Sequence, residues 1–282
     1  MEQDSLKPEL FRKMQILELG MIEELDRVCR KYNINYVMFC GTMLGAIRHK
    51  GFIPWDDDAD IAMLREDYEI FKQHVDELNP DICFFQDHKT DEGYRWGYGK
   101  LRRTGSIYIR KGQEHLKGKT GIFIDIFPMD DIPKSSVGQV LQDFHCFCLR
   151  KILWSEVARV NLKGFWKMWF TLLSKIPTKF VYKQLDSYTK KSKNSTSNRV
   201  RVLLFPSFGR LYRKNPFKER YGMPKEWFLQ REEYEFEGKK FYGAKDYDTE
   251  LNYLYGDYMT PPPEDKRGQH SPCSKIVFPD EN

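Results

Sequence analysis

Four aspartates stand within five positions of this chain, directly before an apolar run, and their spacing could support metal chemistry. They are Asp56, Asp57, Asp58 and Asp60. Because side chains alternate between the two faces of a strand, Asp58 and Asp60 are expected to point the same way and to repel one another unless a cation lies between them. Mg²⁺ or Mn²⁺ prefers such oxygen ligands and leaves positions for phosphate oxygens. The alternative is a solvated acidic turn in which an aspartate caps a helix.

A fifth carboxylate, Asp125, lies in the middle of the strongly apolar run 121–128. A lone carboxylate in such a strand is costly unless it is paired or bound to metal. Asp125 is therefore the candidate third acid, either as a metal ligand beside Asp58 and Asp60 or as a general base. Asp130 and Asp131 follow Pro128 and are expected to form a turn.

Gly41 and Thr42 stand where an expected strand meets an expected helix. A glycine there would let a phosphate approach the backbone, and the helix N-terminus offers free N–H groups and a positive dipole. A Gly-Thr pair is equally an ordinary helix start. Followed by the acidic strand, it gives a layout typical of nucleotidyltransferases.

Several cations precede or follow the acids and could neutralise a diphosphate. The candidates for substrate binding are Arg48, Lys50, Lys100 and Arg102. Lys100 and Arg102 share one face of an expected strand, whereas Arg103 points away. The alternative for each is a solvated surface charge, although the neighbours of Lys100 look buried.

The elements that must position these residues follow from hydrophobic periodicity and from glycine and proline breaks. Helices are expected over 7–32, 43–49, 66–78, 136–160, 164–175, 178–192 and 246–256. Strands are expected over 35–40, 60–64, 82–86, 94–102, 106–110 and 121–127, and one more strand or a hairpin over 234–242. This order predicts an α/β fold with a mixed α+β sheet. It divides into a catalytic core over 1–132, a basic helical region over 133–200, and a C-terminal segment over 201–282 that packs back on the core.

Composition excludes several classes of protein. The chain has 282 residues, with 40% apolar and 31% charged residues, which is globular composition. No apolar stretch approaches the ~18 residues of a spanning helix, and the N-terminus resembles no secretory signal. The six cysteines show no metal or disulfide spacing, which favours a reduced, cytoplasmic chain. The histidines lack the HExxH spacing of a zinc hydrolase.

The segment 162–183 holds five lysines and no acid. Lys163, Lys167, Lys175, Lys179 and Lys183 recur at multiples of four, while Trp166, Trp169, Phe170 and Leu173 lie on another side of the helix. This pattern is typical of an amphipathic helix at an anionic membrane surface. The alternative is a helix whose aromatic residues fill the core while the lysines face water. Pro177 divides the segment into two short helices.

Three runs resemble the LicD family. They are 41–61 (GTMLGAIRHKGFIPWDDDADI), 121–130 (GIFIDIFPMD) and 255–259 (YGDYM), the last followed by PPEDKR. The resemblance implies a nucleotidyltransferase-like fold and a cytoplasmic enzyme, which the basic segment would hold peripherally at the inner face of the membrane. It implies transfer of phosphocholine from CDP-choline to a cell-surface glycan precursor, such as a teichoic acid or lipopolysaccharide sugar, with release of CMP. The wider family includes fukutin-related ribitol-phosphate transferases, so CDP-ribitol and CDP-glycerol remain alternative donors.

In that reaction a divalent metal on Asp58, Asp60 and Asp125 would bridge diphosphate oxygens and stabilise the leaving CMP. Choline would need a cation–π site, for which Tyr94, Trp96 and Tyr98 could form an aromatic wall on one strand face. The alternative is an ordinary aromatic ladder in the core. Two other functions stay open: a nucleotidyltransferase that uses an NTP, and a non-catalytic surface-binding protein. A nucleic-acid partner is not expected, because the aromatics near the basic stretch cluster with leucines.

Overall fold

The strands that carry the acidic residues lie side by side at the centre of the sheet. In this computed structural model, β2 (Asp60–Leu64) pairs in parallel with β6 (Phe123–Asp131), and the register sets Asp60 opposite Asp125. β4 (Gly99–Arg103) pairs antiparallel with β6 and sets Lys100 opposite Asp125. The register therefore brings two acids and one base onto three adjacent strands. The structure describes residues 7–192, 196–205, 221–268 and 272–281.

The complete sheet has the strand order β1-β2-β6-β4-β3, with two short strands added at the end of β6. Its edges are β1 (Val37–Met38) and β3 (Cys83–Gln86). β7 (Arg199–Arg201) pairs with the last residues of β6, and β8 (Met223–Pro224) pairs with β7. Among the described strands of this sheet, β2 and β6 are the only parallel pair. The predicted α/β fold with a mixed sheet is confirmed.

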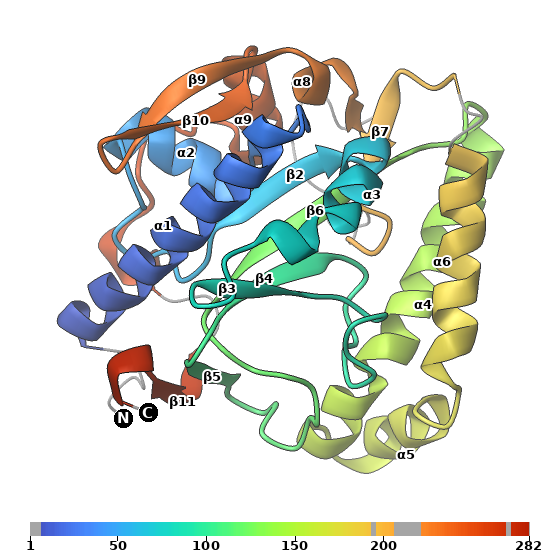
Figure 1. Ribbon diagram of the computed structural model, residues 1–282. Coiled ribbons are helices and arrows are strands. Elements are labelled where there is room, and N and C mark those ends of the chain that lie inside the picture. Colours follow the sequence, from blue (N-terminus) through green and yellow to red (C-terminus); the bar gives the residue numbers. More distant parts are fainter. Residues whose placement is uncertain (1–6, 193–195, 206–220, 269–271, 282) are drawn as a thin grey trace.

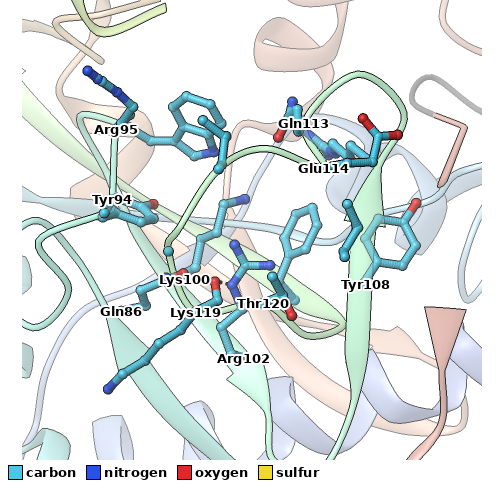
Figure 2. Close-up of a pocket in the computed structure, with 17 residues that line it drawn as sticks. Gln86, Tyr94, Arg95, Lys100, Arg102, Tyr108, Gln113, Glu114, Lys119 and Thr120 are labelled. Carbon is cyan, nitrogen blue, oxygen red and sulfur yellow. Dashed lines mark hydrogen bonds between the residues drawn. The ribbon is translucent and has the colours of Figure 1, made fainter. Parts of the chain in front are cut away.

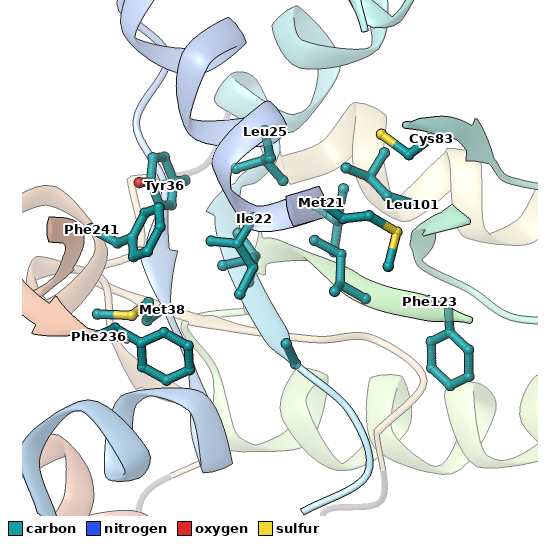
Figure 3. Close-up of a cluster of buried hydrophobic side chains, with 14 of the residues drawn as sticks. Met21, Ile22, Leu25, Tyr36, Met38, Cys83, Leu101, Phe123, Phe236 and Phe241 are labelled. Atoms are coloured by element: carbon teal, nitrogen blue, oxygen red, sulfur yellow. The ribbon is translucent and has the colours of Figure 1, made fainter. Parts of the chain in front are cut away.

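The two faces of the sheet bury different partners, because side chains alternate along each strand. One face packs against α1 (Pro8–Lys31), which crosses the sheet in Figure 1. Figure 3 shows this cluster, which includes Met21, Ile22, Leu25, Met38 and Leu101. The other face, with Phe127 and Met129, meets α8 (Glu226–Leu229) and α9 (Tyr247–Tyr255). Asp60 and Asp125 alternate in phase with this second face.

The remaining elements of the core close around the sheet. α2 (Cys40–His49) leads from β1 toward the acids, and α3 (Arg65–Gln73) with the 3₁₀ turn Val75–Glu77 follows β2. The hairpin of β9 (Arg231–Phe236) and β10 (Lys239–Ala244) contacts α2 and β1. β11 (Cys273–Val277) pairs with β5 (Ile107–Arg110), between the 3₁₀ turns Glu264–Lys266 and Pro279–Glu281. The C-terminal segment therefore returns to the core at two separate places.

The helical region consists of α4 (Ser136–Asn161), α5 (Gly164–Leu173) and α6 (Thr178–Ser192), as the periodicity predicted. α4 and α6 lie alongside one another at the right of Figure 1, and α5 lies at their lower end. Cys146, Leu149, Leu153, Val181 and Leu185 form a separate small core between α4 and α6. Within the described part of the chain, no helix combines the length and the apolar character that crossing a bilayer requires.

Three predictions about local structure are wrong. The helix expected from residue 43 begins at Cys40, so Gly41 and Thr42 belong to its first turn. The strand expected over 94–102 begins only at Gly99, and residues 94–98 form a loop that contains or borders three glycines, at 93, 97 and 99. Asp130 and Asp131 end β6 instead of forming a turn. Arg65 pairs with Asp130 at 2.6 Å and Lys225 with Asp131 at 3.0 Å, which compensates both charges inside the protein.

Candidate functional site

Three carboxylates meet where β2 and β6 begin. Asp58, Asp60 and Asp125 can each offer an oxygen so that all three oxygens lie within 4.8 Å of one another. The parallel register supplies Asp60 and Asp125, and the loop before β2 supplies Asp58. Asp56, Asp57 and Asp58 form a second such group, which shares Asp58 with the first. The structure therefore brings together all three acids predicted from the sequence.

These carboxylates lie inside the protein, so the alternative of a solvated acidic turn is wrong. Asp56, Asp57 and Asp125 are buried, and Asp58 and Asp60 are half-buried. Burial raises the pKa of Asp58, and the nearby charges of Asp125 and Asp56 raise it further. The pKa of Asp60 is raised well above its usual value, first by burial and then by Asp58 and Asp125. Hard oxygen donors that repel one another in this way suit a divalent cation such as Mg²⁺ or Mn²⁺.

A buried lysine contacts the third acid. The Lys100 ammonium donates a hydrogen bond to Asp125 Oδ1 and is fully enclosed, with 1% of its side chain exposed. Burial lowers the pKa of Lys100, while Asp125 favours the charged form. The ammonium also lies 3.5 Å from the centroid of the Phe123 ring. The interpretation of Lys100 as a solvated surface charge is therefore wrong.

Two arginines continue the cationic side of the site. Arg102 is buried, and its guanidinium donates to Gln86 Oε1 at 2.7 Å and to the Gly121 carbonyl at 2.8 Å. Arg110, from β5, donates to Asp58 Oδ2 at 3.3 Å. Together with Lys100, these guanidinium groups line a pocket beside the acids, which Figure 2 shows between β4 and the loop 113–120. The arrangement offers positive charge to an anion that reaches the carboxylates from this side.

Gly41 and Thr42, in the first turn of α2, lie against two of the acids. The Thr42 hydroxyl accepts a hydrogen bond of 2.7 Å from the backbone N–H of Asp60, and Thr42 is only 3% exposed. A Cβ at position 41 would come within 2.2 Å of Asp56 Oδ2, so only glycine allows that carboxylate to lie against the start of α2. Both residues therefore position acids. Direct contact of either residue with substrate stays a prediction.

The Thr42 contact leads to a first prediction. Thr42→Val removes the acceptor of the Asp60 N–H and leaves that buried donor unsatisfied, at a cost of about 1 to 3 kcal/mol. Asp60, the first residue of β2, is then held less firmly. Turnover is therefore expected to fall about 10-fold, while binding of an isolated nucleotide changes less. Steady-state kinetics and denaturant unfolding measure both effects. Thr42→Ser keeps the hydroxyl and is the matched control; if it behaves like Thr42→Val, the hydroxyl has no positioning role.

Arg48 and Lys50 lie toward the other end of α2. Arg48 donates to the Tyr258 carbonyl at 2.7 Å, and burial followed by the charge of Arg267 lowers its pKa. Arg267 in turn lies over the Trp55 ring, 5.0 Å from its centroid. Lys50 is exposed at the helix terminus, with a left-handed φ of 58°. Substrate binding by Arg48 and Lys50 stays a prediction.

The three aromatic residues do not form the flat wall expected on one strand face, because residues 94–98 are not a strand. Tyr94 is buried and its hydroxyl donates to the Tyr98 carbonyl at 2.8 Å. The Tyr98 ring packs against Phe127, with centroids 4.7 Å apart. Trp96 is half-buried and lines both the pocket of Figure 2 and a second pocket that extends to Trp154 of α4. Tyr94 also lines the pocket of Figure 2 and Tyr98 lines the second pocket, and substrate binding by Trp96 and Tyr98 stays a prediction.

Two charged residues near the acids were not predicted from the sequence. Arg110 ends a short strand with no distinctive neighbour, so nothing in the sequence linked it to Asp58. Glu18 is fully buried on α1, and burial together with the charges of Asp58 and Asp57 raises its pKa well above the usual value. A signal for Glu18 was available, because it interrupts the apolar stripe that runs from Met14 to Met21. An acid on the buried face of a helix needs a compensating environment.

Comparisons with known proteins place the residues of this site within a known domain family. The family model "LicD/FKTN/FKRP, nucleotidyltransferase domain" matches residues 33–169, a range that contains every predicted site residue. Over 284 aligned residues the chain is 28% identical to the lipopolysaccharide cholinephosphotransferase LicD of Haemophilus influenzae, with 94% of this chain and 97% of that protein covered. Residues 33–169 of this chain match the nucleotidyltransferase domain of the LicD family. The predicted resemblance is therefore confirmed.

Two Rickettsia proteins are similar to shorter parts of this chain. An uncharacterized protein of Rickettsia typhi is 43% identical over 53 residues, and one of Rickettsia prowazekii is 44% identical over 55 residues. Each match covers only about a fifth of this chain, at 19% and 20%. The similarity to the Haemophilus protein, in contrast, extends over 94% of this chain and so includes the helical region and most of the C-terminal segment.

Proposed function

We propose that this chain transfers phosphocholine from CDP-choline to a hydroxyl of a cell-surface glycan precursor, of lipopolysaccharide or teichoic acid type, and releases CMP. The observation that carries the proposal is the close group of Asp58, Asp60 and Asp125, with Lys100 and Arg110 beside it. Similarity over 94% of the chain to a lipopolysaccharide cholinephosphotransferase supports the choice of transferred group. The six free cysteines are consistent with a cytoplasmic setting.

In the proposed step, the acceptor oxygen attacks the β-phosphorus of the donor. One O–P bond forms, the P–O bond to CMP breaks, and the hydroxyl proton leaves to a nearby base or to water. Such transfers depend on positioning and on neutralising charge. A Mg²⁺ or Mn²⁺ ion held by Asp58, Asp60 and Asp125 would supply Lewis acidity toward the diphosphate.

The protein's own groups have distinct parts in this reaction. Arg102 and Arg110 would bind the anionic diphosphate, since their guanidinium groups line the pocket and stay charged at all relevant pH values. Lys100 would hold Asp125 ionised and oriented. Because Lys100 already compensates Asp125, and because Asp125 is within reach of the two other acids, the geometry favours a ligand role for Asp125 over a general-base role.

A donor comparison tests the proposal. Binding of CDP-choline, CDP-ribitol and CDP-glycerol is measured by calorimetry with and without Mg²⁺, followed by transfer of labelled phosphocholine to purified lipopolysaccharide. Metal-dependent preference for CDP-choline, with label transfer, is the expected result. Equal binding of all three would mean that only the cytidine diphosphate is recognised and would overturn the choline assignment. Preference for CDP-ribitol or CDP-glycerol would favour another CDP-alcohol transferase, and pyrophosphate release from an NTP would favour a nucleotidyltransferase.

Trp96 provides a second prediction about the donor. A quaternary ammonium cannot donate hydrogen bonds and is recognised through aromatic faces. Trp96→Ala is therefore expected to weaken CDP-choline binding about 10-fold while CDP-glycerol binding changes little. Trp96→Phe keeps an aromatic face and is the control, measured in the same titrations. An equal loss for both donors in Trp96→Ala would remove the cation–π assignment and leave Trp96 as part of the pocket wall.

A further inference from the structure

Helix α5 is apolar on nearly every side, yet it lies on the surface. Of its ten residues, only Lys167 and Thr171 carry polar side chains. Phe170 is the one buried residue of this helix and packs edge-on against Trp154 of α4, with ring centroids 5.4 Å apart. A helix with apolar residues all round is normally enclosed by protein or by lipid. In the described structure, no other part of the protein covers most of the apolar surface of α5.

The outward face of α5 is continuous. Phe165, Met168, Trp169 and Leu172 follow the spacing that places side chains on one helix face, and their exposed fractions run from 45% to 63%. Trp166 beside them is 58% exposed. The alternative prediction, that the aromatic residues of this segment fill the core, is therefore wrong for both tryptophans. Large apolar side chains grouped in this way mark an interaction surface.

Positive charge flanks α5 along the chain. Lys163, Lys167, Lys175, Lys179 and Lys183 are all exposed, and the segment 162–183 contains no aspartate or glutamate. A partner must therefore offer apolar area bordered by negative charge. A second copy of the chain meets this condition poorly, because an isologous contact would bring these lysines against themselves. An anionic bilayer meets it, with acyl chains beneath and phosphates at the level of the lysines.

We propose that α5 and its flanking lysines form a docking surface for an anionic lipid bilayer. Phe165, Trp169 and Leu172 enter the boundary between headgroups and acyl chains, and the lysines remain among the lipid phosphates. The chain then associates peripherally, with α5 parallel to the membrane plane. This surface is independent of the phosphocholine assignment, since it rests on the exposure and charge of a helix outside the acid cluster.

α5 lies next to the second pocket, so docking to a bilayer would affect how an acceptor reaches the acids. Trp154, which contacts Phe170 of α5, also lines the second pocket together with Arg110 and Trp96. Arg110 reaches Asp58. A bilayer bound to α5 therefore lies next to a pocket that leads toward the carboxylates. An acceptor anchored in that bilayer could present its hydroxyl through this pocket while its lipid stays in the membrane.

Vesicle sedimentation tests the docking surface directly and needs no enzymatic activity. The full chain is mixed with phosphatidylcholine vesicles that contain either phosphatidylglycerol or no anionic lipid. We expect binding only with phosphatidylglycerol and weaker binding at high salt. Charge reversal to Glu at Lys163, Lys167 and Lys175 should weaken partitioning at least about 100-fold, because each lysine near an anionic surface contributes about 5-fold. Reversal at Lys7, Lys240 and Lys275, exposed residues of other elements, is the matched control and should retain binding.

A second variant tests the apolar residues of the docking surface. Trp169→Gln with Leu172→Gln should abolish vesicle binding and also abolish quenching of tryptophan fluorescence by brominated lipid, while circular dichroism stays unchanged. Equal loss in the lysine variant and in its control would mean a nonspecific charge effect and would overturn the proposal. Self-association of the wild type that this double substitution removes, without vesicle binding, would instead identify a contact between copies. If vesicle binding is observed but CDP-choline is not bound, the docking surface stands and the proposed function fails.

Discussion

Asn in place of Asp58 or Asp60 is expected to abolish phosphocholine transfer, with a loss of about 1,000-fold or more. Each change removes a charged oxygen ligand from a group whose oxygens lie within 4.8 Å of one another, while the size of the side chain is kept. The measurement is release of CMP from CDP-choline under saturating Mg²⁺. Asp76→Asn, which removes an exposed carboxylate on the 3₁₀ turn after α3, is the matched control and should retain activity.

The same two variants should be at least as stable as the wild type when divalent ions are absent. Burial and mutual repulsion raise the pKa values of Asp58 and Asp60, so removing either charge relieves unfavourable energy in the folded state. Thermal unfolding with chelator, and again with Mg²⁺, measures this. We expect Mg²⁺ to raise the unfolding temperature of the wild type and to have less effect on the variants. Near-normal turnover in either variant would contradict the metal assignment.

Loss of the buried cation is the second large effect. Lys100→Met leaves Asp125 buried without its ion-pair partner, which is expected to cost about 3 to 5 kcal/mol of stability. Turnover should fall at least about 100-fold, because Asp125 is then no longer held in its present orientation. Denaturant unfolding and the transfer assay measure the two effects. Lys117→Met, which changes an exposed lysine that does not line the pocket, is the control.

A double variant separates the structural part of Lys100 from its part in the reaction. Lys100→Met with Asp125→Asn removes both charges of the pair and should recover most of the lost stability, since no buried charge is left alone. Transfer activity should stay absent in the double variant. If the double variant is no more stable than Lys100→Met alone, the cost arises from packing around Lys100 and not from the unpaired charge of Asp125.

The acids could be identified from the sequence because burying a carboxylate among apolar residues costs free energy unless it has a partner. Asp125 lies in an apolar strand, and Asp58 and Asp60 precede another, so elementary electrostatics already required a partner. The partner of Asp125 is Lys100, and the alternation of Lys100 and Arg102 on one strand correctly predicted their common face. What could not be predicted was the register that sets Lys100 opposite Asp125, because it depends on pairing between distant strands.

Other features depended on contacts that a local pattern does not contain. Gly41 suggested an approach for phosphate, but the group that lies against it is Asp56, brought there by the loop after α2. Asp130 suggested a turn after Pro128, but Arg65 from α3 makes it part of a strand end. For α5, periodicity defined the faces of the helix without revealing which face a neighbour would cover. In the described structure Phe170 is buried and Leu173 is half-buried, while the other large apolar residues of α5 are exposed.

The parallel pairing of β2 with β6 also restricts the order in which the chain can assemble the group of Asp58, Asp60 and Asp125. Asp60 and Asp125 become neighbours only after the intervening chain has closed a long loop, and closing such loops is slow compared with forming helices or hairpins. While β6 is still being synthesised, the acids before β2 have no partner on the next strand. A divalent ion that needs both Asp60 and Asp125 would therefore bind only after this loop has closed. Its binding would then lock a sheet that has already formed.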